Sequence, residues 1–422
     1  MRKVRLGDIA NIDISGIDKK TKDGEQSVRL CNFTDVYYNW AITKNMYDGL
    51  MEASASESDI ESFLLRKGMV VITKDSETRD DIGISTYIAD DFEDVVLGYH
   101  CALIVPKDDI PEEDRVYGKY LNALLHTKYA QKYFYNNATG SGQRYTLSKE
   151  SIEDMSVFLP TYREQVRIGN YLSDIDRKIE INNLINAELE SMAKQIYDYW
   201  YIQFDFPNEN NKPYKSSGGK MIWNDILKRE IPDGWDVVPL SHYLDTYVEK
   251  ISPNEVSGDD RYAPIEVLPR RKMSFWKCAP TEEAISSLCR FKKNNILLSN
   301  RRVYFHKVCI AAFSGITRDT VIVIKPSFEK TLGYSYQLVN DDSFIDYATR
   351  HSYGTEQPVL SWESAKLYNV LKPLNSLEVL YSKNVEPIIE NVLNNELEID
   401  ALNKHREAIL PLLIYGQYSI KE

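Results

Sequence analysis

Long apolar runs are absent from this sequence of 422 residues. No stretch approaches the ~20 consecutive apolar residues that a membrane-spanning helix needs, so a membrane protein is not expected. The N-terminus is basic and leads to Asp8 instead of an apolar segment, which argues against a secretory signal peptide.

Cysteine is also scarce. The five cysteines form no CxxC pair, which predicts free thiols in a reducing cytoplasm, and they are Cys31, Cys101, Cys278, Cys289 and Cys309.

Signatures of catalysis are missing as well. No Pro-Pro pair occurs, although an adenine methyltransferase needs a polar residue followed by Pro-Pro and an aromatic residue at its flipped base. The nearest match to a GxxxxGK[ST] nucleotide-binding loop, residues 217–221, lacks the hydroxyl for Mg²⁺ and the upstream glycine. No HExxH motif or Cys/His cluster indicates zinc. We therefore expect no catalytic residue, no metal and no cofactor. The enzyme alternative, a nuclease, rests only on the acidic pairs Asp80-Asp81 and Asp90-Asp91.

The net charge is −12, from 51 Lys and Arg against 63 Asp and Glu, which does not favour nucleic-acid binding by the chain as a whole. Residues 268–307 are an exception, because ten basic residues there face only Glu282 and Glu283, an excess of eight positive charges. Such an excess predicts a surface that contacts phosphates, although the same charges also suit an ordinary solvated surface. The ten basic residues are Arg270, Arg271, Lys272, Lys277, Arg290, Lys292, Lys293, Arg301, Arg302 and Lys307.

The sequence repeats itself, at a constant offset of 213 residues from Leu147 onward. Upstream of that point the match continues with small deletions in the second copy, since residues 103–106 resemble 323–326, residues 69–72 resemble 296–298, and residues 4–6 resemble 238–240. Residues 1–200 and 235–415 therefore look like two copies of one architecture, each a globular part followed by a long helix. At the offset of 213 the matching pairs include Leu147 and Leu360, Ser151 and Ser364, Val157 and Val370, Pro160 and Pro373, Asn182 and Asn395, and Leu189 and Leu402.

Residues 161–200 are predicted to form the first long helix. Pro160 precedes them, and Thr161 with Glu164 three residues later has the form of a capping box. In the second helix, Pro387 fits near the first turn and Pro411 near the end. At 1.5 Å per residue, about 35 residues make a rod about 50 Å long, which would act as a spacer between two globular parts.

Apolar residues recur in both helices at steps of three and four, which predicts one packing seam between them. We expect antiparallel packing, in which asparagines buried at matching positions would fix the register. The alternative leaves these asparagines in solvent on a curved seam. The predicted seam consists of Ile168, Leu172, Ile175, Ile179, Asn182, Leu189 and Ile196 in the first helix and Val385, Ile388, Val392, Asn395, Ile399, Leu402 and Ile409 in the second.

Two motifs carry a resemblance to a known family. One is Leu159-Pro160-Thr161-Tyr162-Arg163-Glu164-Gln165 at the start of the first helix. The other is the segment from Phe204-Asp205-Phe206-Pro207 to Ile231-Pro232-Asp233-Gly234-Trp235. With these motifs, the chain resembles the specificity (S) subunit of type I restriction-modification systems over nearly its whole length.

The resemblance implies a mixed α/β fold class. Two target-recognition domains, related by a pseudo-twofold, would be separated by a pair of long antiparallel coiled-coil helices. It also implies a non-catalytic subunit that binds a bipartite site in double-stranded DNA, docks two modification (methyltransferase) subunits and is joined by restriction-translocase subunits. The implied boundaries are a first recognition domain at 1–160, a spacer helix at 161–203, a linker at 204–234, a second recognition domain at 235–380 and a second helix at 381–422.

DNA contacts are expected where basic and polar residues follow strands or turns. Gln143 and Arg144 follow a glycine turn, and these residue types suit adenine and guanine respectively. Basic residues also follow the strands at 69–73 and 296–299. The expected DNA-binding residues are Lys74, Arg79, Gln143, Arg144, Arg270, Arg271, Lys272, Lys277, Arg301, Arg302 and His351. The net charge also leaves open an acidic coiled-coil interaction protein or a DNA mimic.

Overall fold

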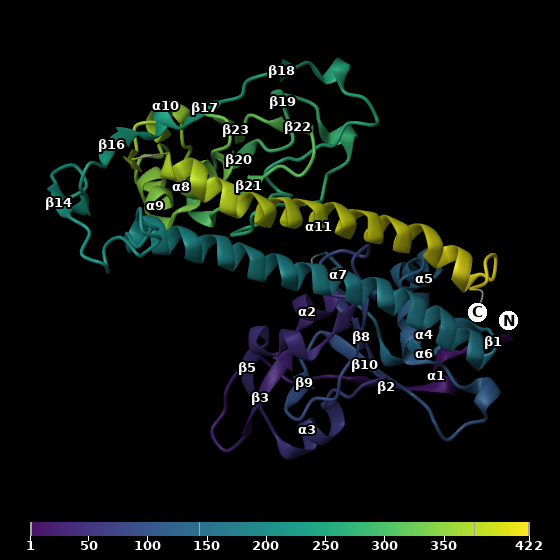
Figure 1. Ribbon diagram of the computed structural model, residues 1–422. Helices are drawn as coiled ribbons and strands as arrows, with labels where there is room; N and C mark the ends of the chain where they lie inside the picture. Colours follow the sequence, from purple (N-terminus) through teal and green to yellow (C-terminus); the bar gives the residue numbers. More distant parts are fainter. Residues whose placement is uncertain (1, 143, 375, 421–422) are drawn as a thin grey trace. The chain divides into compact units, whose positions relative to one another are not determined.

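The computed structural model describes residues 2–142, 144–374 and 376–420. It contains two compact units, one formed by Met1–Ile179 with Leu402–Glu422 and the other by Glu180–Ala401. Two long helices, α7 (Tyr162–Tyr197) and α11 (Leu377–Ile414), are the longest elements of the chain (Figure 1). Each helix belongs partly to the first unit and partly to the second. None of the described helices combines the length and apolar character that a bilayer crossing requires.

The first unit is built on a five-stranded sheet with the strand order β2-β10-β6-β8-β4. Strand β6 is buried at every position, and its side chains alternate between two clusters. Val70 and Ile72 pack with helices α4 and α5, whereas Val71 packs with strand β9. An apolar strand without polar alternation therefore indicates a sheet that is covered on both faces.

The strands of the first unit are β1 (Arg2–Arg5), β2 (Ala10–Ile14), β3 (Gln26–Cys31), β4 (Ala41–Ile42), β5 (Met51–Ala55), β6 (Val70–Thr73), β7 (Asp75–Ser76), β8 (Ser85–Ile88), β9 (Val95–Leu97), β10 (Cys101–Pro106), β11 (Thr139–Ser141), β12 (Arg144–Thr146) and β13 (Ser156–Leu159). Its short helices are α1 (Leu6–Ile9), α2 (Phe33–Tyr38), α3 (Glu57–Phe63), α4 (Gly118–Leu125), α5 (Lys128–Asn137) and α6 (Lys149–Glu153).

The second unit has a four-stranded sheet, β17-β23-β20-β21, and a separate three-stranded sheet, β18-β19-β22. Its strands are β14 (Met221–Asn224), β15 (Arg229–Pro232), β16 (Asp236–Pro239), β17 (Leu244–Thr246), β18 (Lys250–Ile251), β19 (Leu288–Phe291), β20 (Ile296–Ser299), β21 (Val308–Ile310), β22 (Gly315–Arg318), β23 (Val321–Pro326) and β24 (Asn369–Lys372). Its short helices are α8 (Leu332–Asn340), α9 (Asp342–Arg350) and α10 (Trp362–Ala365).

The strand registers follow the internal repeat. Val4 lies opposite Val157 in the antiparallel pair β1 and β13. Val238 lies opposite Val370 in the pair β16 and β24. The repeat makes Val4 equivalent to Val238 and Val157 equivalent to Val370. In both copies, therefore, the first strand pairs with the strand that precedes the long helix.

The central strands show the same correspondence. Ile104 of β10 lies opposite Val70 of β6, and Ile324 of β23 lies opposite Ile296 of β20. The two copies therefore share one strand frame, although the spacing between the strands differs in the sequence.

The long helices differ at their starts. The capping box predicted for α7 is confirmed, because the amide of Glu164 donates to Oγ1 of Thr161 at 3.4 Å and the amide of Thr161 donates to a Glu164 carboxylate oxygen at 3.1 Å. The expected place of Pro387 near the first turn of the second helix is wrong. Helix α11 begins at Leu377, so Pro387 lies inside it and removes one donor from the helical hydrogen-bond ladder.

The two helices run antiparallel within each unit. In the second unit, Asn186 contacts Glu396, and the carbonyl of Ala193 accepts a hydrogen bond from Tyr381. In the first unit, Asp176 accepts a hydrogen bond from Arg406. Of the predicted seam residues, Ile168, Leu172, Ile175, Asn182, Val385, Val392 and Ile399 are buried, and Ile179, Leu189, Ile196, Ile388, Asn395, Leu402 and Ile409 are half-buried.

Candidate nucleic-acid interface

Charged side chains of the first unit meet around Asp75, two residues after β6. The Asp75 side chain is 7% exposed, and its carboxylate lies 2.9 Å from Nζ of Lys74, 2.5 Å from Nδ1 of His100 and 3.2 Å from Nη2 of Arg144. Burial raises the pKa of Asp75, but hydrogen bonds from Thr146, His100 and Lys74 outweigh burial and hold the pKa well below its ordinary value. The carboxylate is therefore ionised at neutral pH and anchors the basic groups around it.

The backbone places these groups. Asp75 pairs with Thr146 of β12 in the three-stranded sheet β11-β12-β7. The amide of Lys74 donates to the carbonyl of His100 at 2.9 Å. His100 has a φ of 71°, in the left-handed region that a non-glycine residue rarely adopts. Such local strain persists only where neighbouring contacts hold it, and here the contact is the bond from the imidazole to Asp75.

A pocket of about 510 Å³ opens beside the Asp75 cluster. Tyr37 closes one side, where its hydroxyl donates to Asp81 at 2.8 Å. Burial, followed by that hydrogen bond, raises the pKa of Tyr37 to about 12, so the phenol stays protonated at neutral pH. The lining residues are Phe33, Thr34, Tyr37, Tyr38, Asp75, Ser76, Glu77, Thr78, Asp81, His100 and Arg144.

The basic residues expected to bind DNA in this unit have different surroundings. The Lys74 side chain is 17% exposed and is bound to Asp75, whereas the Arg144 side chain is 65% exposed. Arg79 lies over the ring of Tyr145 at 4.9 Å. Gln143 lies outside the described residues.

The second copy carries Arg301 where the first carries Asp75. Arg301 forms a bridge with Val359, the residue that the offset of 213 matches to Thr146. The amide of Leu360 donates to the carbonyl of Asn300, as the amide of Leu147 donates to that of Lys74. Basic residues do follow both strands, but they do not stand at equivalent positions, since the counterpart of Lys74 is Asn300.

Part of the basic window of the second unit gathers near the short 3₁₀ helix Val303–Phe305 and α9. Arg270 lies over the ring of Phe305 at 3.9 Å, and Nη2 of Arg271 lies 3.0 Å from a carboxylate oxygen of Asp342. Arg302 is exposed, and its φ of 47° is also left-handed. His351 directly follows α9 and stacks on Tyr347.

Other residues of the window lie elsewhere. Burial raises the pKa of Glu190 and of Glu396 in the long helices, and the positive charge of Lys272 offsets part of the rise in both. Lys277 is exposed, while Nη1 of Arg290 lies 3.1 Å from Asp260. Acidic residues outside the window thus neutralise part of its positive charge, and the ten basic residues do not form one uniform surface.

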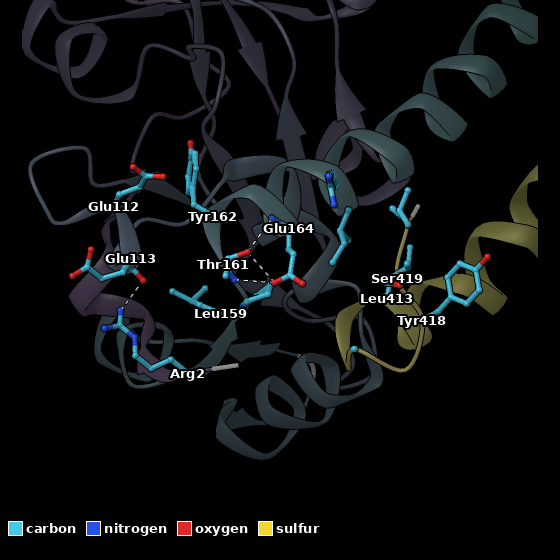
Figure 2. Close-up of a pocket in the computed structure, with 15 residues that line it drawn as sticks. Arg2, Glu112, Glu113, Leu159, Thr161, Tyr162, Glu164, Leu413, Tyr418 and Ser419 are labelled. Carbon is cyan, nitrogen blue, oxygen red and sulfur yellow. Dashed lines mark hydrogen bonds between the residues drawn. The ribbon is translucent and has the colours of Figure 1, made fainter. Parts of the chain in front are cut away.

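A larger cavity, of about 810 Å³, lies in the first unit between the start of α7 and the segment after α11. Figure 2 shows Thr161 and Glu164 of the capping box on one side and Leu413, Tyr418 and Ser419 on the other. Both acidic and basic side chains line the cavity. One of the acidic residues, Glu164, accepts a hydrogen bond from the hydroxyl of Thr161. Arg2 and Arg167 line the cavity together with Glu112, Glu113 and Glu164, so its surface is not uniformly basic.

Sequence reasoning did not identify Asp75 or His100. An acidic residue next to a lysine gives no signal for DNA binding in one sequence, and the contact with His100 depends on the fold. Within the described residues, no group of three or more histidine, cysteine, aspartate and glutamate side chains is arranged to hold a metal ion.

The chain is similar to known proteins over most of its length. Residues 1–191 match the family described as the type I restriction modification DNA specificity domain. The chain is 25% identical over 386 residues to the type I restriction enzyme MjaIX specificity subunit of Methanocaldococcus jannaschii, covering 88% of this chain and 83% of that protein. It is 21% identical over 416 residues to the HindI specificity subunit of Haemophilus influenzae, covering 84% and 87%.

The fold is similar to that of a solved structure. The S subunit of a type I restriction-modification system from M. genitalium matches with a TM-score of 0.56 and 14% identity, covering 98% of this chain and 95% of that one. The chain is thus similar over most of its length to specificity subunits of type I restriction enzymes, and residues 1–191 match the DNA specificity domain of that family.

Proposed function

We propose that the chain reads a bipartite site in double-stranded DNA, one half-site with each repeat copy, and catalyses no reaction itself. The observation that carries this proposal is that the two copies share the same strand pairing but differ in the side chain that follows their central strand. Asp75 with its basic partners stands in the first copy and Arg301 in the second. Because base readout depends on which side chains reach the groove, one frame with two side-chain sets suits two different half-sites.

The partners we propose are modification subunits, which carry the methyltransferase chemistry, and restriction-translocase subunits that join them. A row of exposed apolar side chains on α7 supports a docking role, because contiguous apolar surface marks interaction sites. Ile181, Leu184, Ile185 and Met192 are between 43% and 50% exposed and follow helical spacing. We also propose that each chain binds two modification subunits and that the complex acts on DNA in the cytoplasm.

Mapping methylated adenines tests the function directly. We expect co-expression with the cognate modification subunit, in a host without other methylation, to give one bipartite motif, and the chain alone to methylate and cleave nothing. A complex verified by gel filtration that methylates no motif would contradict the proposal. Metal-dependent cleavage by the purified chain would favour the nuclease alternative.

Salt dependence separates a DNA reader from an acidic DNA mimic. Contacts to phosphates release counterions, so affinity for duplex DNA should fall steeply as salt rises. A mimic would show no such binding at any salt concentration.

A further inference from the structure

We infer that Asp75 positions Arg144 to read a guanine in the half-site bound by the first repeat copy, with the adjoining pocket receiving the base edge. This inference rests on the proposed DNA-reading function and adds to it a base and a positioning residue. Its basis is the geometry of the Asp75 cluster.

The first step is the charge balance around Asp75. A buried carboxylate needs a cationic partner, and Lys74 already supplies one at 2.9 Å with little exposure. Arg144 is not required for neutralisation, and most of its side chain is open to solvent. The contact between Arg144 and Asp75 therefore restrains the guanidinium and leaves its remaining donors available.

The second step is the donor count. Arginine has five N–H donors in a rigid fork. Nδ1 of His100 lies 2.5 Å from Asp75 and 2.9 Å from Nη2 of Arg144, and a single ring nitrogen can make only one of these bonds. When Nδ1 carries the proton it donates to Asp75, and one Nη2 hydrogen of Arg144 donates to the same carboxylate. The second Nη2 hydrogen, with an N–H of Nη1 or Nε, then forms a pair of adjacent donors. Guanine offers the matching pair of acceptors, N7 and O6, in the major groove.

The third step is the pocket beside Arg144. Phe33, Tyr37 and Tyr38 of α2 line it together with Arg144. Tyr38 is among the most exposed large side chains of the chain. A restrained guanidinium at the edge of an open aromatic pocket suits a flat base edge.

The second copy lacks an arginine held by an aspartate at this position. Arg301 occupies the position of Asp75, and extending the offset of 213 a few residues upstream of Leu147 places Gln357 at the position of Arg144. Changes to Asp75 or Arg144 should therefore act on one half-site only, which makes the unaffected half-site an internal control.

The experiment uses the full chain co-expressed with its modification subunit, with methylation measured on a library in which each position of both half-sites is randomised. For Arg144→Ala, we expect the preference for guanine to fall about tenfold or more at a single position of one half-site. Asp75→Asn should lower the preference at the same position, and the double variant should lose no more than Arg144→Ala alone. Lys149→Ala and Gln357→Ala are the matched controls and should leave that position unchanged.

The salt dependence of DNA binding provides the second readout. A base contact leaves the slope of log affinity against log salt nearly unchanged, whereas a phosphate contact lowers it by about one and weakens all sequences alike. A uniform loss with Arg144→Ala would overturn the inference. An unchanged base preference with that variant would overturn it too.

Folding of the Asp75 variants is checked by thermal melting. If Asp75→Asn melts early, Asp75→Glu keeps the charge but displaces it by one methylene, and it should also reduce the guanine preference. If the Asp75→Glu variant is stable and keeps the full preference for guanine, Asp75 does not position Arg144. A wild-type complex that methylates no motif would instead contradict the proposed function, so the two failures are distinguishable.

Discussion

Asn186 of α7 donates a hydrogen bond from Nδ2 to the Glu396 carboxylate of α11 at 3.0 Å, and both side chains are buried, at 1% and 4% exposure. A second bond runs from Nδ2 of Asn395 to Oδ1 of Asn186 at 2.8 Å. The buried polar groups satisfy one another, so the pairing of the two helices has one favoured register in the second unit.

Asn186→Ala should lower the free energy of unfolding by about 1–3 kcal/mol, because it leaves the buried Glu396 carboxylate and the Asn395 amide without a partner. Urea denaturation of the full chain measures this loss. The control is Glu188→Ala on the exposed side of the same helix, which should change stability by less than about 0.5 kcal/mol. Equal effects of the two substitutions would contradict the prediction.

Glu396 should make stability depend on pH. Burial raises its pKa to about 7, and Lys272 and Asn186 offset only part of that rise, while Glu190 adds to it. The folded chain therefore binds this proton more tightly than the unfolded chain. The contribution is fully present below the unfolded pKa of about 4.5 and is lost as pH rises through about 7, a change of at most about 3 kcal/mol.

Glu396→Gln isolates this contribution, because the amide is neutral at every pH. We expect the stability of the variant relative to wild type to increase between pH 5 and pH 8, measured by urea denaturation. The pKa of His126, which burial lowers to about 4, acts in the opposite direction but is common to both chains and cancels in the difference. A difference that stays constant over this range would refute the assignment.

Thr161→Ala should lower the free energy of unfolding by about 1 kcal/mol, because the amide of Glu164 loses its acceptor at the start of α7. Thr161→Ser retains the hydroxyl and should cost much less. Thermal melting of the two variants side by side makes the comparison.

Neutral substitutions at Arg301 and Arg302 together should weaken DNA binding while the complex with the modification subunit still assembles. If both side chains contact phosphates, the slope of log affinity against log salt should fall by up to about two. Gel filtration reports assembly, and titration of labelled duplex reports affinity. Unchanged affinity at low salt would exclude both residues from the interface.

Ile185→Asp combined with Met192→Asp should disrupt binding of the modification subunit without unfolding the chain. Both side chains are exposed, at 44% and 50%, so the carboxylates stay in water until a partner buries them. Lys194→Ala, on the same helix, is the control. Co-purification gives the result, and an intact complex would place the docking surface elsewhere.

The sequence by itself determined the repeat, the correspondence of several strands between the two copies and the start of α7. These features rest on local patterns. Val4 and Val157 pair as Val238 and Val370 do because equivalent apolar strands fold in equivalent ways. Thr161 caps α7 through a residue only three positions away. Periodicity and capping need no knowledge of distant residues.

Only the tertiary structure decided which charges meet. Arg271 contacts Asp342, and Asp75 gathers His100 and Arg144, across separations of 25 to 71 residues that no local pattern encodes. The same holds for Arg301, which only its strand bridge to Val359 aligns with Asp75. Electrostatic interactions depend on distance in space, and that distance is set when the strands pair and the helices pack.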